Sequence, residues 1–282
     1  MVRFMIWMYG NDFQTWENPD DDGVVLAVAN GIKSVDLRHI HATELNYPTS
    51  GSLDDTRWEA LVELDGAYTY YHTYARVLTE YNRRNLKPIF MEEASYKFEH
   101  NANTDGGSLR TCGVENIGRC SRALRDKLHG SKYTWALPTG WFSSWRSHLD
   151  TPGVTQLGYM KNLFARLRWY DLVPDQIHTV VTDGYGTPAT LGTGSVATDT
   201  YATAAASSGR QISHCIRADH PPNNRGYVQA LGSDRGSLVR PGIGEYIKVG
   251  GSLFSNTGST QFTPPGKNHD RDGDWVLVLE AS

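Results

Sequence analysis

Residues 67–93 read AYTYYHTYARVLTEYNRRNLKPIFMEE and predict a strand, a helix and a second strand. We predict the first strand at 67–71, the helix at 72–84 and the second strand at 87–91. The helix has an amphipathic pattern, with one face formed by Tyr74, Val77, Leu78 and Tyr81. Strand, helix and strand joined by short loops predict a right-handed parallel βαβ unit.

The same alternation precedes this unit. Residues 3–9 and 34–43 predict strands, and residues 20–30 and 52–64 predict helices. The first helix opens with acidic residues, which suit a helix amino terminus. The first part of the chain is therefore predicted to be α/β, with a parallel sheet.

The pattern changes after a helix predicted at 153–169. Its apolar face is formed by Leu157, Met160, Leu163, Phe164 and Leu167. Beyond Pro174 the chain is rich in Thr, Gly and Ser and predicts β segments, the last at 275–280. We place a boundary near 172–176, between an α/β domain at 1–173 and an all-β domain at 174–282.

The composition is that of an ordinary globular protein, with 39% hydrophobic and 21% charged residues. A net charge of −4 offers no basic patch for nucleic acid and no polybasic membrane anchor. No stretch approaches the roughly 20 apolar residues that a membrane helix needs. Residues 1–13 lack the features of a signal peptide and suit a buried strand better. The location of the chain is left open.

No metal site or cofactor is predicted. Cys112, Cys120 and Cys215 lack metal-ligand spacing. In the acidic stretch HDRDGDW at 269–275, Gly is the fourth residue counted from Asp270, whereas an EF-hand loop needs it at the sixth. We expect a turn before the last strand instead of a calcium loop.

Two carboxylates follow predicted strands. Asp12 closes WMYGND, and Glu93 closes KPIFMEE. In a parallel α/β barrel, functional residues lie at the carboxyl ends of strands. Glycosidases need such a pair, in which one group protonates the leaving oxygen and the other attacks or activates water. The alternative is a helix-capping Asp and a solvated Glu.

Longer segments show a family resemblance. WMYGND at 7–12, KPIFMEEASYKFEHN at 87–101 and TPGVTQLGYMKNLFARLRWYDLVPDQ at 151–176 resemble the apiosidase-like family of glycoside hydrolases. YATAA at 201–205 and FTPPGKNHDRDGDWVLVLE at 262–280 resemble the small β domain that follows it. That domain is labelled collagen-binding, which is a name and not a demonstrated activity.

The resemblance implies the C-terminal part of a (β/α)8 TIM barrel, strands four to eight, followed by a small sandwich-like β domain. It also implies a retaining glycosidase of plant cell-wall or similar polysaccharides, with an Asp after the fourth strand as acid/base and a Glu after the seventh as nucleophile. Carried onto this chain, these are Asp12 and Glu93, with Glu92 as the competing nucleophile. Family members are expected to be exported.

Side chains near the carboxylates are candidate contacts for an oligosaccharide or polysaccharide substrate: His41, Glu44, Tyr70, Tyr96 and Trp135. His41 and Glu44 follow the second strand and could hold sugar hydroxyls. Tyr70 could hydrogen-bond the nucleophile, and Trp135 could form a platform for a sugar ring. For each of them a structural role is the alternative. The oligomeric state is left open.

Two segments read as out of frame. Codons that can encode residues 115–130, when they are read two bases further on, can encode the helix that the family has there. Codons that can encode residues 210–242, when they are read one base further on, can encode segments with the alternating pattern of strands. As written, residues 113–130 and 210–242 are predicted to have ragged secondary structure and few buried contacts. The resemblance also implies that three strand-helix units precede the first strand. We therefore expect the chain as written to lack glycosidase activity, so a non-catalytic binding fragment and a decayed gene product are rival interpretations.

Overall fold

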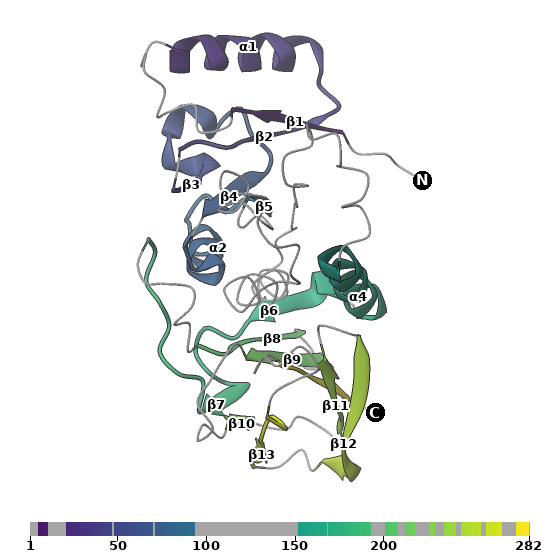
Figure 1. The fold of residues 1–282 in the computed structure, drawn as a ribbon. Helices are drawn as coiled ribbons and strands as arrows, with labels where there is room; N and C mark the ends of the chain where they lie inside the picture. Colours follow the sequence, from purple (N-terminus) through teal and green to yellow (C-terminus); the bar gives the residue numbers. More distant parts are fainter. Residues whose placement is uncertain are drawn as a thin grey trace, which may run out of the picture. The chain divides into compact units, whose positions relative to one another are not determined.

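The computed structural model of the chain describes residues 5–10, 21–46, 48–69, 71–93, 152–167, 169–192, 201–207, 212–217, 226–228, 234–240, 244–254, 258–266 and 275–281. Its sheets and few helices form a mixed α/β protein (Figure 1). The described residues fall into two compact units. The first holds those up to Glu93, and the second holds nearly all of those from Pro152 onward. The predicted boundary near 172–176 stays a prediction.

The first unit begins with a strand–helix–strand unit, drawn in purple in Figure 1: β1 (Ile6–Tyr9), α1 (Asp21–Val35) and β2 (Ile40–Thr43). β1 and β2 are parallel, and Tyr9 lies beside Thr43. Asp21 and Asp22 are in the first turn of α1 and Lys33 is in its last turn, which are the charges that a helix dipole favours. The predicted order of elements is confirmed here.

The predicted boundary between α1 and β2 is wrong. The helix was expected to end at residue 30 and the strand to begin at 34, but helical bonding continues, because the Asp36 backbone N donates to the Ile32 carbonyl oxygen at 2.8 Å. The apolar Val35 and Leu37, which suggested a strand, are 84% and 83% exposed. They pair with no neighbouring strand among the described residues, so the apolar pattern misled the prediction.

The prediction of one helix at 52–64 is also wrong. The segment contains β3 (Thr49–Gly51) and two 3-10 turns, η2 (Ser52–Asp54) and η3 (Thr56–Trp58). Asp55 separates the two turns in an extended conformation, and its side chain accepts a hydrogen bond from the Arg57 backbone N. Asp commonly makes such local bonds to backbone N–H groups, and these compete with a continuous helix.

A second strand–helix–strand unit follows: β4 (Asp65–Thr69), α2 (Thr73–Tyr81) and β5 (Ile89–Glu93). β4 and β5 are parallel, and β3 is antiparallel to β4. The strand, helix and strand predicted at 67–91 are therefore confirmed, with boundaries displaced by one to three residues. Ala67, Val77 and Met91 form a buried cluster that packs α2 against the two strands.

The larger apolar core of the first unit lies between α1 and the neighbouring strands and turns. Tyr9 stacks on Trp58, with 5.7 Å between the ring centroids, and Trp58 is fully buried. The rest of this core consists of Trp7, Val25, Leu26, Ala29, Ile32, Leu45, Leu53, Leu61 and Val62. The positions in α1 recur at intervals of three to four residues, which places them on one helix face.

The second unit contains α4 (Pro152–Arg166), the 3-10 turn η6 (Trp169–Asp171) and two antiparallel sheets. The six-stranded sheet has the order β12 (Glu245–Phe254), β11 (Asp234–Arg240), β14 (Trp275–Ala281), β9 (Ile212–Arg217), β8 (Thr203–Ser207) and β6 (Leu172–Pro174). The three-stranded sheet has the order β13 (Thr260–Phe262), β10 (Gly226–Val228) and β7 (Val181–Asp183).

Residues from both sheets form one buried cluster, which includes Val181 of β7, Phe262 of β13, and Leu277 and Leu279 of β14. Val276 and Val278 alternate with these leucines and are also buried. In a strand, alternate side chains point to opposite faces, so both faces of β14 are covered. The predicted helix 153–169 and last strand 275–280 are confirmed to within three residues.

The prediction of ragged structure at 210–242 is wrong where the structure describes this segment. β9 pairs with both β8 and β14, and β11 pairs with both β12 and β14, over continuous antiparallel registers apart from one shift near Asp234. The segment as written thus supplies two interior strands of the sheet. Residues 115–130 lie outside the described residues. In the described part of the chain, no helix is long and apolar enough to cross a membrane.

Candidate active site

The candidate site lies where parallel strands end. β1 pairs with β2, and β4 pairs with β5. The two pairs are connected, because the backbone N–H groups of Glu63 and Leu64, just before β4, donate to the His41 carbonyl oxygen at 3.0 and 3.1 Å. Farther along, one hydroxyl bridges Thr43 of β2 and Gly66 of β4. β2 and β4 therefore run in the same direction, and the carboxyl ends of all four strands face one way.

The bridging hydroxyl belongs to Ser52, which is fully buried. Its oxygen accepts from the backbone N of Gly66 at 2.8 Å and from the backbone N of Thr43 at 3.3 Å, and it donates to the Thr43 carbonyl oxygen at 2.6 Å. Both the donor and the acceptor capacity of the hydroxyl are used. Ser52 thus replaces the ladder bonds that β2 and β4 lack.

At the end of β2, Glu44 continues the pairing to β1. Its backbone N donates to the Tyr9 carbonyl oxygen at 3.0 Å, and the Thr43 hydroxyl donates to the same oxygen at 3.2 Å. The Glu44 side chain is buried, with 2% of the residue exposed. The structure places this candidate substrate contact directly after the carboxyl end of β2.

His41 lies deeper, in contact with the core beneath α1. Its Nδ1 is 2.5 Å from the Tyr9 hydroxyl, and the two rings stack with centroids 5.7 Å apart. Burial raises the pKa of Tyr9 to about 12, with smaller effects of the Glu63 and Asp36 carboxylates. The Tyr9 hydroxyl therefore keeps its proton at neutral pH. The His41 Nε2 is buried and has no hydrogen-bond partner among the described residues.

The two glutamates at the end of β5 differ. Glu92 is 3% exposed. Its carboxyl group rests against the Cα of Gly66, where a Cβ would overlap it. The backbone of Glu93 lies opposite Tyr68 of β4, and its side chain lies outside the described residues. The remaining predicted site residues, Asp12, Tyr70, Tyr96 and Trp135, also lie outside the described residues.

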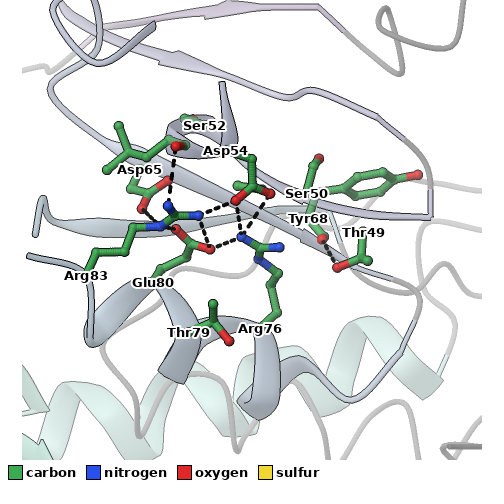
Figure 2. Close-up of polar contacts among 12 residues, drawn as sticks. Thr49, Ser50, Ser52, Asp54, Asp65, Tyr68, Arg76, Thr79, Glu80 and Arg83 are labelled. Atoms are coloured by element: carbon green, nitrogen blue, oxygen red, sulfur yellow. Dashed lines mark hydrogen bonds and ion pairs between the residues drawn. The ribbon is translucent and has the colours of Figure 1, made fainter. Parts of the chain in front are cut away.

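A partly buried ion cluster lies near the opposite end of β4 (Figure 2). It contains three carboxylates and two guanidinium groups: Asp54, Asp65, Glu80, Arg76 and Arg83. Glu80 is fully buried and is bound by both arginines. Gly51 makes room for the cluster, because a Cβ there would lie 2.6 Å from the Arg76 Nη2 and 2.7 Å from the Glu80 Oε1.

The pKa values of two carboxyl groups in the cluster, Asp65 and Asp54, are shifted in opposite directions. Burial raises the pKa of Asp65 to about 6, although Arg83 and Arg76 act in the other sense. Burial also acts to raise the pKa of Asp54, but the charge of Arg76 and the hydrogen bond from Gly51 outweigh it, so this pKa lies below its usual value. The charges of the cluster pair with one another near the amino end of β4, which indicates a structural role.

Sequence reasoning missed Ser52, Gly66 and this cluster as contributors to the site and its support. A Gly inside a strand often marks a bulge or a close approach, which was the available signal for Gly66. The spacing of Arg76 and Glu80, four apart on a helix, was a signal for their pairing. Among the described residues, no group of three or more His, Cys, Asp or Glu side chains could hold a metal ion.

Comparisons with protein families and with solved structures both point to glycoside hydrolases. A family model described as "Apiosidase-like, catalytic domain" matches residues 2–171, which is more than half of the chain. Three solved chains match. One of them, a "Glycoside hydrolase", has a TM-score of 0.72 and 17% sequence identity, and the match covers 98% of this chain and 64% of that chain. No curated protein matches.

Proposed function

Because the chain belongs to the apiosidase-like family of glycoside hydrolases, we propose that its site serves the hydrolysis of glycosidic bonds by a retaining mechanism. In this proposal β1, β2, β4 and β5 are the fourth to seventh strands of a TIM barrel, and residues 174–282 are a sandwich-like β domain. The substrate class is a plant cell-wall or similar polysaccharide.

The observation that carries the proposal is the common direction of the four parallel strands. Glu93 is the last residue of β5, and Asp12 follows β1 by three residues. Because contacts between β2 and β4 connect the two pairs, the carboxyl ends of β1 and β5 lie at the same end of the sheet, which we call the site edge. A retaining pair needs carboxyl groups about 5–5.5 Å apart, which residues at one edge of a parallel sheet can reach.

In the proposed mechanism, Glu93 attacks the anomeric carbon while Asp12 protonates the departing glycosidic oxygen. Asp12 then removes a proton from water, which attacks the same carbon and releases Glu93. Glu44, His41, Tyr70, Tyr96 and Trp135 are the proposed contacts to the sugar. Glu44 and His41 fit this role in part, since Glu44 lies at the carboxyl end of β2 and the His41 Nε2 is left without a partner among the described residues.

The test uses two versions of the protein, because the matched hydrolase is longer than the part of it that this chain spans. One version is the 282-residue chain. The other is the product of the gene read with its adjoining upstream frame and with 115–130 and 210–242 in the alternative frames. Both are assayed on aryl glycosides and pectic oligosaccharides, alone and with Asp12→Asn or Glu93→Gln.

We expect hydrolysis by the longer version and its loss in both variants. Loss of the acid/base should lower the rate by about 10²–10⁴-fold. Hydrolysis that neither substitution affects would contradict the residue assignment. Absence of hydrolysis from both versions, with retained binding of the oligosaccharides, would favour a non-catalytic binding protein.

A further inference from the structure

The ladder between β4 and β5 contains one extra residue. Ala67 pairs with Met91, but the next residue, Tyr68, pairs with Glu93. Glu92 therefore falls between two paired positions of the ladder, which is the pattern of a β-bulge. Bulges are rare in parallel pairs and are over-represented beside active sites, where they redirect a side chain. This bulge lies at the last residues of the strand that carries the proposed nucleophile.

The extra residue changes the register at position 93. Met91 and Ala67 share the buried cluster with Val77 of α2, so they lie on the helix side of the sheet. In an unbroken strand, position 93 would share the face of Met91, because residues two apart share a face. The bulge instead sets the backbone of residue 93 opposite Tyr68, which alternates with Ala67 along β4. Without the bulge, position 93 would belong to the helix side.

Gly66 and Glu92 pack against each other beside the bulge. The carboxyl group of Glu92 occupies the space beside the Gly66 Cα, and any Cβ at that position would overlap the carboxyl carbon and both oxygens. Gly66 is held in place, since its backbone N donates to the Ser52 hydroxyl at 2.8 Å. The backbone of β4 is therefore held, so an added Cβ at position 66 would displace the carboxyl end of the flexible Glu92 side chain, for which the glycine leaves room.

We propose that Gly66 and Glu92 are positioning residues, whose packing holds the bulge that brings Glu93 into register with Tyr68 at the site edge. The inference rests on the proposed function of Glu93 as nucleophile. Glu92 acts through shape and burial in this account, and Glu93 makes the bond to the sugar. An isosteric Glu92→Gln should therefore keep the register, whereas Gly66→Ala should lose it.

The register is tested without any need for activity. Cys112, Cys120 and Cys215 are replaced by Ser, and Tyr68→Cys and Glu93→Cys are introduced as a cross-strand pair. We expect a disulfide between them in the Gly66 background and with Glu92→Gln, and its loss with Gly66→Ala. Adding Glu92→Ala to Gly66→Ala removes the overlapping carboxyl group and should restore part of the disulfide. Equal disulfide yield in all four backgrounds would overturn the proposal.

If the cysteine pair prevents folding, crystal structures of the Gly66→Ala and Glu92→Gln chains give the register directly, and Tyr68 opposite Glu93 in the Gly66→Ala chain would overturn the proposal. In the version that hydrolyses glycosides, Gly66→Ala should lower kcat with little change in KM, and adding Glu92→Ala should restore part of the lost kcat. A different outcome would separate the two proposals. If Gly66→Ala loses the register but Glu93→Gln has no effect on hydrolysis, the role of Glu93 as nucleophile is contradicted, whereas the role of Gly66 and Glu92 in holding the bulge is supported.

Discussion

The Ser52 hydroxyl and the Gly66 backbone N–H, 2.8 Å apart, connect two pairs of parallel strands in the first unit. The same hydroxyl contacts both backbone groups of Thr43. In the described residues β2 and β4 share no continuous ladder, so this side chain adds to the two backbone hydrogen bonds that Glu63 and Leu64 donate to the His41 carbonyl oxygen. The alignment of the two strand pairs depends on this buried oxygen together with those backbone bonds.

Ser52→Ala should destabilise the first unit by about 2–4 kcal/mol, because it leaves a buried N–H of Gly66 and both backbone groups of Thr43 with fewer partners. Urea unfolding measures the change. Ser34→Ala is the matched control, since its hydroxyl donates to the Gly31 carbonyl oxygen at an exposed position. Equal effects of the two substitutions would show that the Ser52 bridge adds no stability.

Arg76→Met should cost about 3–5 kcal/mol, because the fully buried Glu80 loses one of its two charge partners. Adding Glu80→Leu should recover much of this loss, since neither substituted side chain then carries a buried charge. Arg57→Met is the control, because Arg57 pairs with Asp55 and Asp22 at the surface and such pairs contribute about 0–1 kcal/mol. A small effect of Arg76→Met alone would contradict the buried network in Figure 2.

Asp65 should make the stability of the first unit depend on pH between about 4 and 6. Its folded pKa of about 6 exceeds the ordinary value of 3.8, so the folded state binds the proton more tightly. The contribution is full below pH 3.8 and is lost as the pH rises through 6. Its size is on the order of 2–3 kcal/mol, from about 1.4 kcal/mol per pKa unit. The charged groups that act on Asp65 are Arg83, Arg76 and Asp54.

The check is urea unfolding from pH 4 to pH 8 for the native chain and Asp65→Asn. The variant should lack this fall in stability with rising pH, and the difference between the two curves should level off above about pH 7. Asp54 acts in the opposite sense, because its lowered pKa stabilises the fold at higher pH. Parallel curves for the native chain and Asp65→Asn would show that Asp65 is not the group that titrates.

The strand–helix–strand units could be predicted because their signals are local. In α2, Tyr74 and Val77 recur at helical spacing on one face, and both are buried as predicted. In α4, the predicted face of Met160, Leu163, Phe164 and Leu167 is buried as well. Periodicity reports burial directly, so such elements can be read from one sequence. Their ends were less certain, as the misplaced start of β2 shows.

The finer support of the site could not be predicted, because it depends on contacts between distant residues. Ser52 and Gly66 are 14 positions apart, and Asp54 and Arg83 are 29 apart. The overlap that excludes a side chain at Gly66 appears only when β4 and β5 lie in register. The expected helix is interrupted at Asp55, whose side chain accepts a local hydrogen bond from the Arg57 backbone N. The assignments of Asp12 and Glu93 came from family resemblance, and they stay predictions.

The most direct test of the central claim compares two adjacent glutamates in the version that hydrolyses glycosides. Glu93→Gln and Glu92→Gln are each assayed for kcat on the best aryl glycoside. If Glu93 is the nucleophile and Glu92 positions it, Glu93→Gln should lower kcat on the order of a thousandfold or more, and Glu92→Gln should keep most of it. The reverse order, with Glu92→Gln inactive and Glu93→Gln active, would contradict the account.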